Sequence, residues 1–235
     1  GIPNEDSVDI QLDTSNLFAQ NRFTGIDGQE DGARVNYGLR SGVYGDNGRY
    51  ARVFIGQSYR FDDDNIFPNG SGLEDKSSDV VGQINLGLSQ YLRADYRFQL
   101  DNRHLTMRRH ELLAHGGNDL FTLNLGYIYF DGIAGTGFTE SREQMQVDGV
   151  YRLTPFWSLN AYTLMDLGQE PGLRKASLGI MYADECFTFG IQGTRNLINE
   201  ASGENGTVLM ARIGFKNIGE VSSPKIQLQR EVETP

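Results

Sequence analysis

The sequence predicts an all-β fold: an antiparallel up-and-down transmembrane β-barrel, with about eleven strands present. Three observations lead to this fold class. Apolar and polar residues alternate along most of the chain, the alternating segments are long, and short connections take turns with long ones. The segments run about ten to fourteen residues, whereas strands of soluble proteins usually have about five or six and a tilted membrane strand needs about nine to eleven.

The composition of the 235-residue chain allows this fold and argues against two other classes. The net charge of −10 argues against a nucleic-acid partner, because phosphate binding requires a basic patch. No apolar stretch approaches the roughly 18 residues of a membrane-spanning helix. Only 38% of the residues are hydrophobic, which suits a barrel, since only every second side chain of a strand faces lipid. The chain starts Gly-Ile-Pro without an initiating Met or a signal peptide, so we expect a piece of a longer product.

Alternation defines each strand. Along residues 92–101 every second residue is apolar, beginning with Leu92, and the residues between are polar or charged, beginning with Arg93. Successive side chains of a strand point to opposite faces, so this segment has one apolar and one polar face. Residues 50–61 repeat the pattern with one apolar exception, Phe54, on the polar face. The predicted strands are, in order, 33–44, 48–61, 79–89, 91–101, 104–115, 118–130, 140–153, 155–166, 172–183, 185–195 and 206–216.

Three segments are less regular. Residues 104–115 and 140–153 carry charge on both faces, as Arg108 and Arg109 illustrate. Residues 8–13 alternate weakly and could add a twelfth strand.

The connections separate by length. The odd-numbered ones are short and fall at Gly45–Asn47, Gln90, Gly116–Gly117, Thr154 and Asp184. The even-numbered ones are longer and polar, at 62–78, 131–139, 167–171 and 196–205, with a short exception near Asn102–Arg103. Outer-membrane barrels have short periplasmic turns and longer external loops, whereas a soluble meander has no reason to sort its loops in this way.

The polar face is expected to line the barrel lumen. A soluble β-sandwich or a lipocalin-type barrel would also alternate, but with its apolar face inside. The charge on the strand 91–101 favours a wet lumen, since four of its residues are charged on one face. The predicted polar wall consists of Arg52, Arg60, Arg93, Asp95, Arg97, Lys175 and Arg212.

Aromatic residues gather on the apolar face near the strand ends that meet at short turns. Membrane barrels place an aromatic girdle at each interface with water. The predicted periplasmic girdle consists of Tyr151, Trp157, Tyr182, Phe187 and Phe215.

Neither a metal site nor a catalytic site is expected. The three histidines, His104, His110 and His115, have no Cys or carboxylate that completes a metal set. No Ser is tied to them as a barrel lipase would require. The run Asp62–Asp64 could hold Ca²⁺ or Mg²⁺, but it lacks spaced ligands and is better explained as a solvated external loop. The protein is therefore expected to be no enzyme and to have no cofactor.

Several blocks of the chain resemble the C-terminal half of the lipopolysaccharide-assembly family, LptD. The block from Asn16 to Asp27, with Glu30–Gly32 and Tyr37–Leu39 after it, is the most specific. The similarity extends, with gaps, from the first residues to about residue 216. Its other parts are Ile2–Ser7, Asp79–Gly82 and Tyr182–Phe187.

This resemblance implies a domain organisation. The family's barrel has about 26 strands, so residues 1–235 would be its C-terminal part. A periplasmic domain would precede them in the sequence. Within it, residues 1–32 would be a lead-in and external loop, 33–216 the strands, and 217–235 a periplasmic tail.

The resemblance also implies a function and partners. The function would be insertion of lipopolysaccharide into the outer leaflet of the bacterial outer membrane, through the lumen and a lateral seam. The partners would be lipopolysaccharide, outer-membrane lipid, a lipoprotein plug in the lumen, and a periplasmic lipopolysaccharide bridge acting through the upstream domain. The cations of the polar wall would either contact phosphorylated sugar or the plug, or pair with wall carboxylates such as Asp95 and Asp101. A passive diffusion porin is the alternative.

The strand 206–216 would be one lip of the seam. Its residues Leu209, Ala211, Ile213 and Phe215 would face lipid.

Cys186 is the single cysteine, so no disulfide can form within the chain. A lone cysteine is often a small buried hydrophobe. The family carries a cysteine near this point that pairs with the periplasmic domain. The resemblance therefore implies an interdomain disulfide at Cys186, on the side of the membrane where oxidising conditions permit one.

Overall fold

The structure is a computed structural model of the whole chain. It describes residues 11–19, 21, 32–62, 67–133, 139–197, 206–215, 219–223 and 226–228. No helix in these residues is long and apolar enough to cross a membrane.

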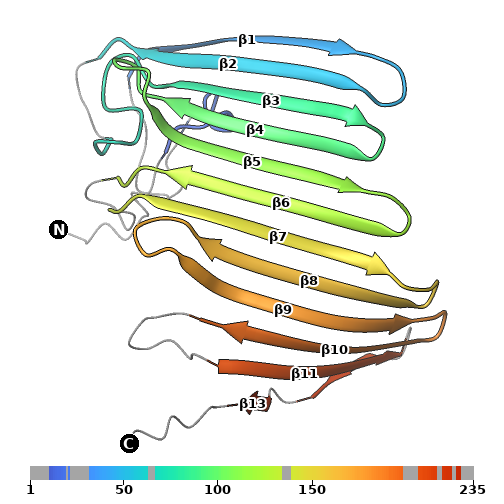
Figure 1. Ribbon diagram of the computed structural model, residues 1–235. Helices are drawn as coiled ribbons and strands as arrows, with labels where there is room; N and C mark the ends of the chain where they lie inside the picture. The colour runs from blue at the N-terminus through green and yellow to red at the C-terminus, as the bar shows by residue number, and fades with distance from the viewer. Residues whose placement is uncertain are drawn as a thin grey trace, which may run out of the picture. The chain divides into compact units, whose positions relative to one another are not determined.

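The described residues form one antiparallel β-sheet whose strands follow the order of the chain from β1 to β12, with β13 also paired to β11 (Figure 1). The predicted fold class is confirmed, and each predicted strand is present with ends that move by three residues at most. The strands are β1 (Arg34–Tyr44), β2 (Tyr50–Arg60), β3 (Val80–Ser89), β4 (Leu92–Leu100), β5 (Met107–Gly117), β6 (Phe121–Phe130), β7 (Arg142–Arg152), β8 (Trp157–Asp166), β9 (Gly172–Ala183), β10 (Phe187–Asn196), β11 (Gly206–Phe215), β12 (Gly219–Ser222) and β13 (Ile226–Leu228).

The short turns have local chemical causes. Between β1 and β2, Asn47 and Gly48 both have positive φ angles, of 58° and 75°, as a tight hairpin that matches the strand twist requires. Three further turns begin with a side-chain oxygen that accepts hydrogen bonds from the second and third backbone N–H groups after it. These oxygens belong to Asn118, Thr154 and Asp184.

The structure differs from the sequence-based prediction at several places, including residues 118–120, which form a turn before β6 instead of the start of a strand. Residues 104–106, predicted to begin a strand, belong to a loop, because Asp101 Oδ1 accepts the N–H groups of Arg103 and His104 at 3.0 and 2.7 Å. The possible strand 8–13 lies partly outside the described residues, and its described part, 11–13, is not a strand.

β12 and β13 had no counterpart among the predicted strands. The proposed domain boundary at 217–235 stays a prediction.

Two compact units make up the chain: residues 1–114 with 127–143, and residues 115–126 with 144–235. In the first unit, the apolar face of β2 is bare: Val53 and Ile55 are 44% and 42% exposed. Part of the polar face is covered, and Ser58 there is only 3% exposed. In the second unit, Leu178 on β9 is 64% exposed between Ala161 and Gly193. The apolar face therefore points away from protein in both units, as a lipid-facing surface does.

Candidate functional site

The polar face of β2, β3 and β4 brings several predicted wall residues into register. Arg52 pairs across strands with Asn85, and Asn85 pairs with Asp95. Asn85 donates a hydrogen bond to the Asp95 carboxylate. Arg97 lies on the same face, with its Nη1 3.6 Å from Oε2 of Glu111. Asp95 is thus hydrogen-bonded to the Asn85 amide, and Arg97 forms an ion pair with Glu111.

The remaining wall cations of this unit fall into two kinds. Arg60 is 9% exposed and its guanidinium carbon lies 5.6 Å from the centre of the Phe67 ring. Arg52 lies 4.8 Å from the ring centre of Tyr50, but like Arg93 it remains exposed. Exposed cations on this face are available to a ligand, whereas Arg60 serves the packing of the loop that follows β2.

A polar network continues along the same kind of face in the second unit. His115 Nδ1 and Asn124 Oδ1 lie 2.6 Å apart, and Asn124 Nδ2 donates to Asp148 Oδ2 at 2.7 Å. Asp148 pairs across strands with Tyr162, and the Lys175 ammonium lies 5.6 Å from the centre of the Tyr162 ring.

Arg212 shares the face of Lys175. Arg212 pairs across strands with Gly190, and Gly190 pairs with Met181, so these three residues lie on one face. Met181 and Lys175 are an even number of residues apart on β9 and therefore share that face.

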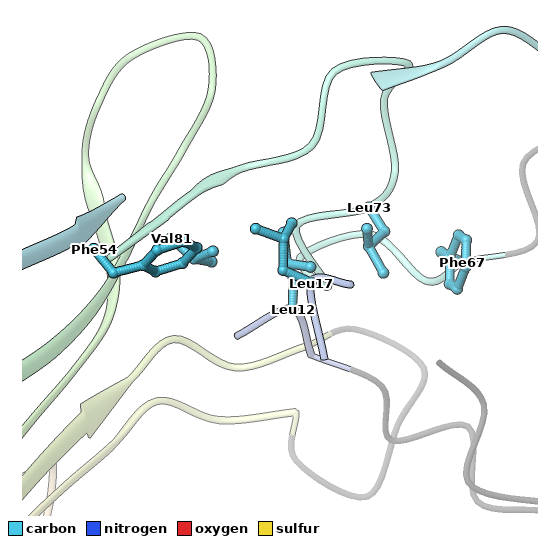
Figure 2. Close-up of a cluster of buried hydrophobic side chains, with 6 residues drawn as sticks. All are labelled: Leu12, Leu17, Phe54, Phe67, Leu73 and Val81. Atoms are coloured by element: carbon cyan, nitrogen blue, oxygen red, sulfur yellow. The ribbon is translucent and has the colours of Figure 1, made fainter. Parts of the chain in front are cut away.

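One segment packs onto the polar face of the first unit. Leu12 and Leu17 are fully buried, and Figure 2 shows their side chains between Phe54 and Val81 on one side and Leu73 and Phe67 on the other. The apolar exception at Phe54 is thereby explained, because it gives residues 11–19 an apolar seat on an otherwise polar face.

The seated segment is a compact turn. Asp13 Oδ1 accepts the N–H groups of Ser15 and Asn16 at 2.7 and 3.0 Å. In return, the Asn16 side chain accepts the N–H of Asp13 at 2.9 Å and donates to the Gln11 carbonyl at 2.8 Å. Reciprocal bonds of this kind fix a turn without strand or helix.

Replacing Gly56 with Ala is expected to dislodge this segment at a cost of about 1–3 kcal/mol, because overpacking of a filled site is destabilising. A Cβ atom there would lie 2.5 Å from Leu17 Cδ2 and 3.0 Å from the Tyr37 carbonyl oxygen. The Leu12 N–H, which donates to the Ser71 carbonyl at 3.0 Å, should exchange with solvent faster in the full-length protein.

Gly190→Ala is the matched control for that substitution. Gly190 also lies on a polar strand face, but its Cβ would meet only the Ile180 carbonyl, at 3.7 Å. Equal exchange rates of the Leu12 N–H in wild type and Gly56→Ala would contradict the packing of residues 11–19 against this face.

A second cluster lies at the end of the first unit that carries the longer loops. Arg108 Nη1 lies 2.6 Å from Glu74 Oε1, its Nε lies 3.3 Å from Asp79 Oδ2, and its Nη2 pairs with Asp101. All four side chains are mostly buried, with Asp79 only 3% exposed. One guanidinium therefore joins the loop after β2 to the loop after β4.

The two aspartates titrate in opposite directions. Burial raises the pKa of Asp79 to about 6, outweighing the hydrogen bond from Gln99 and the charge of Arg108, which lower it. Burial also acts to raise the pKa of Asp101. Hydrogen bonds from Arg108 and from two backbone N–H groups together have a larger effect, and they hold that pKa well below its ordinary value.

Cys186 lies in the short turn before β10, and its thiol side chain is exposed. Its N–H donates to Asp184 Oδ1 at 2.8 Å, so the turn holds the residue in place. Cys186 is therefore not buried in the way that a small hydrophobic residue usually is, and its thiol is accessible.

Four of the five residues of the predicted aromatic girdle form a continuous row beside this turn. The ring of Tyr182 lies 5.1 Å from Trp157 and 5.8 Å from Phe187, whose ring lies 5.8 Å from Phe215. The Tyr182 hydroxyl donates to Asp184 at 3.0 Å. Tyr151, also predicted here, is 51% exposed.

The histidines do not come together. His104 lies 3.3 Å from the Asp101 carboxylate in a loop, His110 contacts the rings of Tyr127 and Tyr129, and His115 contacts Asn124. The described residues contain no group of His, Cys, Asp and Glu side chains that could hold a metal ion. In the acidic run, Asp62 accepts the N–H of Ala33 at 2.8 Å, and Asp63 and Asp64 lie outside the described residues.

Two comparisons identify relatives of the chain. The sequence model of a family described as "LptD: LPS transport system D" matches residues 1–157. The LPS-assembly protein LptD of Nitrosococcus oceani is 25% identical over 94% of this chain and 29% of its own length. The proteins of the same name from Acinetobacter baumannii and Chromohalobacter salexigens are 23% and 25% identical, over 95% and 94% of this chain and 28% and 30% of their own lengths.

The chain thus spans less than a third of the length of the curated relatives it matches. Its open antiparallel sheet with a bare apolar face is part of a β-barrel of the bacterial outer membrane. Since the family model covers more than half of the sequence, this chain belongs to the LptD family.

Proposed function

We propose that this chain forms part of the wall of a lipopolysaccharide translocon, in which the polar face lines the path of the sugar. The observation that carries the proposal is the two-faced sheet of an LptD-family chain. Its apolar face is bare, and its polar face presents the exposed cations Arg52, Arg93 and Lys175. Exposed cations suit the phosphate groups of lipopolysaccharide, because charge-assisted hydrogen bonds to phosphate are strong.

The test is photocrosslinking in the full-length protein during transport. A photoreactive residue at Lys175 is expected to capture lipopolysaccharide only while lipopolysaccharide is being supplied. The same residue at the adjacent Ala176, on the opposite face of β9, should capture surrounding lipid whether or not supply continues. The proposal fails if sites on the polar face, Lys175 and Arg212 included, yield no supply-dependent adduct in correctly assembled protein.

The porin alternative makes a different prediction. A diffusion porin would admit small sugars into liposomes, which then swell, without any supply of lipopolysaccharide. We propose instead that a lipoprotein plug fills the lumen against the polar face and that lipopolysaccharide arrives from a periplasmic bridge through the upstream domain. Swelling by the whole protein with its plug bound would favour the porin.

We further propose that β11 is one lip of a lateral seam. Leu209, Ile213 and Phe215 are 41%, 39% and 49% exposed on one face of this strand, where acyl chains would pass. With Ala211 they line up beside the apolar residues of β10.

Replacing Cys186 with Ser in the full-length protein is expected to abolish a crosslink to the periplasmic domain and to slow assembly. The thiol is exposed in a turn at the short-turn end of the sheet, where the oxidising periplasm permits a disulfide. Mobility on non-reducing gels measures the crosslink. Glu185→Ser, in the same turn, is the control and should leave mobility unchanged, and an unchanged mobility for Cys186→Ser would refute the disulfide.

A further inference from the structure

The outer edge of β11 is occupied by the chain's own C-terminal segment. β12 pairs with residues 212–215 of β11, and β13 pairs with residues 207–209. β12 and β13 therefore both run antiparallel to β11, and β13 lies beside β11 (Figure 1). In the first unit, by contrast, β1 has β2 as its only paired strand among the described residues.

The coverage of this edge is nearly continuous. Between β12 and β13, the Ser223 N–H donates to the Ala211 carbonyl at 2.8 Å, and the Ala211 N–H donates to Ser223 Oγ at 3.0 Å. Across this point the register moves by one residue, since Arg212 pairs with Ser222 but Leu209 pairs with Ile226. A β-bulge of this kind lets two short strands follow one long edge.

A bare edge at this place would be costly. The N–H and C=O groups along the free side of a strand have no water to bond in the hydrocarbon of a bilayer, and each unsatisfied group is expensive there. A seam that parts at β11 exposes a row of such groups. Backbone pairing with any strand satisfies them, because the ladder hydrogen bonds do not depend on the side chains.

We propose that β12 and β13 together act as a surrogate edge strand, which occupies the free edge of β11 whenever the seam is open and leaves it when the barrel closes. This inference rests on the proposed seam at β11. The closing strand competes with β12 and β13 for the same hydrogen-bonding edge, so β11 pairs either with the closing strand or with these two strands. The segment lowers the cost of opening, and its departure restores the closed wall.

The first test is a register-specific crosslink in the full-length protein in the outer membrane. Val208 and Gln227 are cross-strand partners, so Val208→Cys with Gln227→Cys should form an oxidant-induced disulfide that appears as a mobility shift. Val208→Cys with Ile226→Cys is the matched control, because a shift of one residue turns the side chain to the opposite face. Equal crosslinking of the two pairs would overturn the proposal.

The second test asks whether the pairing matters for transport. Proline has no N–H and is tolerated poorly within paired strands, so Val221→Pro with Gln227→Pro should slow lipopolysaccharide delivery to the surface at least tenfold. Assembly, measured by heat-modifiable mobility, should be unchanged, since the closed barrel leaves the segment unpaired. Val232→Pro, four residues after β13 in the sequence, is the control and should deliver lipopolysaccharide at the wild-type rate.

Failure of this inference and failure of the proposed function give different results. If wild type delivers lipopolysaccharide and the double proline variant does so equally fast, the surrogate strand is refuted and the translocon stands. If wild type delivers none while the Val208–Gln227 crosslink forms, the proposed function is refuted.

Discussion

Replacing Arg108 with Met will destabilise the loop cluster of the first unit by about 3–5 kcal/mol, the usual cost of removing one partner from a buried ion pair. Arg108 neutralises Glu74, Asp79 and Asp101, all of which are mostly buried. Without it, three mostly buried carboxylates repel one another and have no cation to neutralise them. Hydrogen exchange of the full-length protein in a lipid bilayer measures the effect at the Asp101 and Leu105 N–H groups, which are bonded within the loop at 2.9 and 3.0 Å.

Arg103→Met is the matched control for this experiment. Arg103 pairs with Asp75 in the same loops, but its side chain is 66% exposed. Exposed ion pairs contribute about 0–1 kcal/mol, so exchange should change little. Similar exchange in the two variants would show that Arg108 does not hold the loops together.

The same cluster predicts how loop protection depends on pH. The pKa of Asp101 lies below its ordinary 3.8, so its contribution to stability is present above 3.8 and is lost as the pH falls through the lower folded-state value. The pKa of Asp79 is raised to about 6, so its contribution is present below 3.8 and is lost as the pH rises through about 6. Protection from exchange, corrected for the intrinsic rate, should therefore be greatest near pH 3.8 and should fall as the pH rises toward about 6.

Arg108→Met should change the shape of that profile. The hydrogen bond from Arg108 that lowers the pKa of Asp101 is gone, while those from the Arg103 and His104 N–H groups remain, so protection should fall less at low pH than in wild type. Asp79→Asn should remove the loss of protection that wild type shows as the pH rises from 3.8 to about 6. Parallel profiles for wild type and Arg108→Met would contradict the assigned roles.

The strands could be predicted from the sequence because two periodic signals coincide in them. Alternation fixes which residues share a face, and the order of short and long connections fixes the direction of each strand. Even the exception at Phe54 was visible in the sequence. What it contacts was not, because Leu12 lies in a segment that alternates only weakly and Leu17 follows it, both far from β2 in the chain.

Contacts between loops escaped prediction for a similar reason. Arg108 and Arg109 were recognised as charges that interrupt the alternation of one strand, but no spacing in the sequence connects Arg108 with Glu74. The network of His115, Asn124 and Asp148 depends on the register of neighbouring strands, which the sequence of each strand alone does not fix. β12 and β13 are set by the edge available on β11 more than by their own residues.

Leu178→Arg is expected to cost about 2–4 kcal/mol, the value for a cation near the middle of a lipid-facing strand. Leu178 lies at the centre of β9, and it is 64% exposed because its cross-strand neighbours are Ala161 and Gly193. In water a substitution at such an exposed site would be nearly neutral, so its cost measures whether hydrocarbon covers this face. Folding of the full-length barrel into lipid vesicles under a urea titration gives the free energy.

Gln192→Arg is the matched control, because it introduces the same charge on the polar face of the sheet. Gln192 lies on the neighbouring strand β10 at the same level as Leu178, but its side chain is on the polar face, where it donates to Ser177 Oγ at 3.3 Å. An arginine there loses one weak hydrogen bond and keeps contact with water, so its cost should stay below about 1 kcal/mol. Equal costs for the two variants would mean that both faces meet the same medium. The difference between them therefore tests the one arrangement on which lumen, seam and surrogate strand all depend.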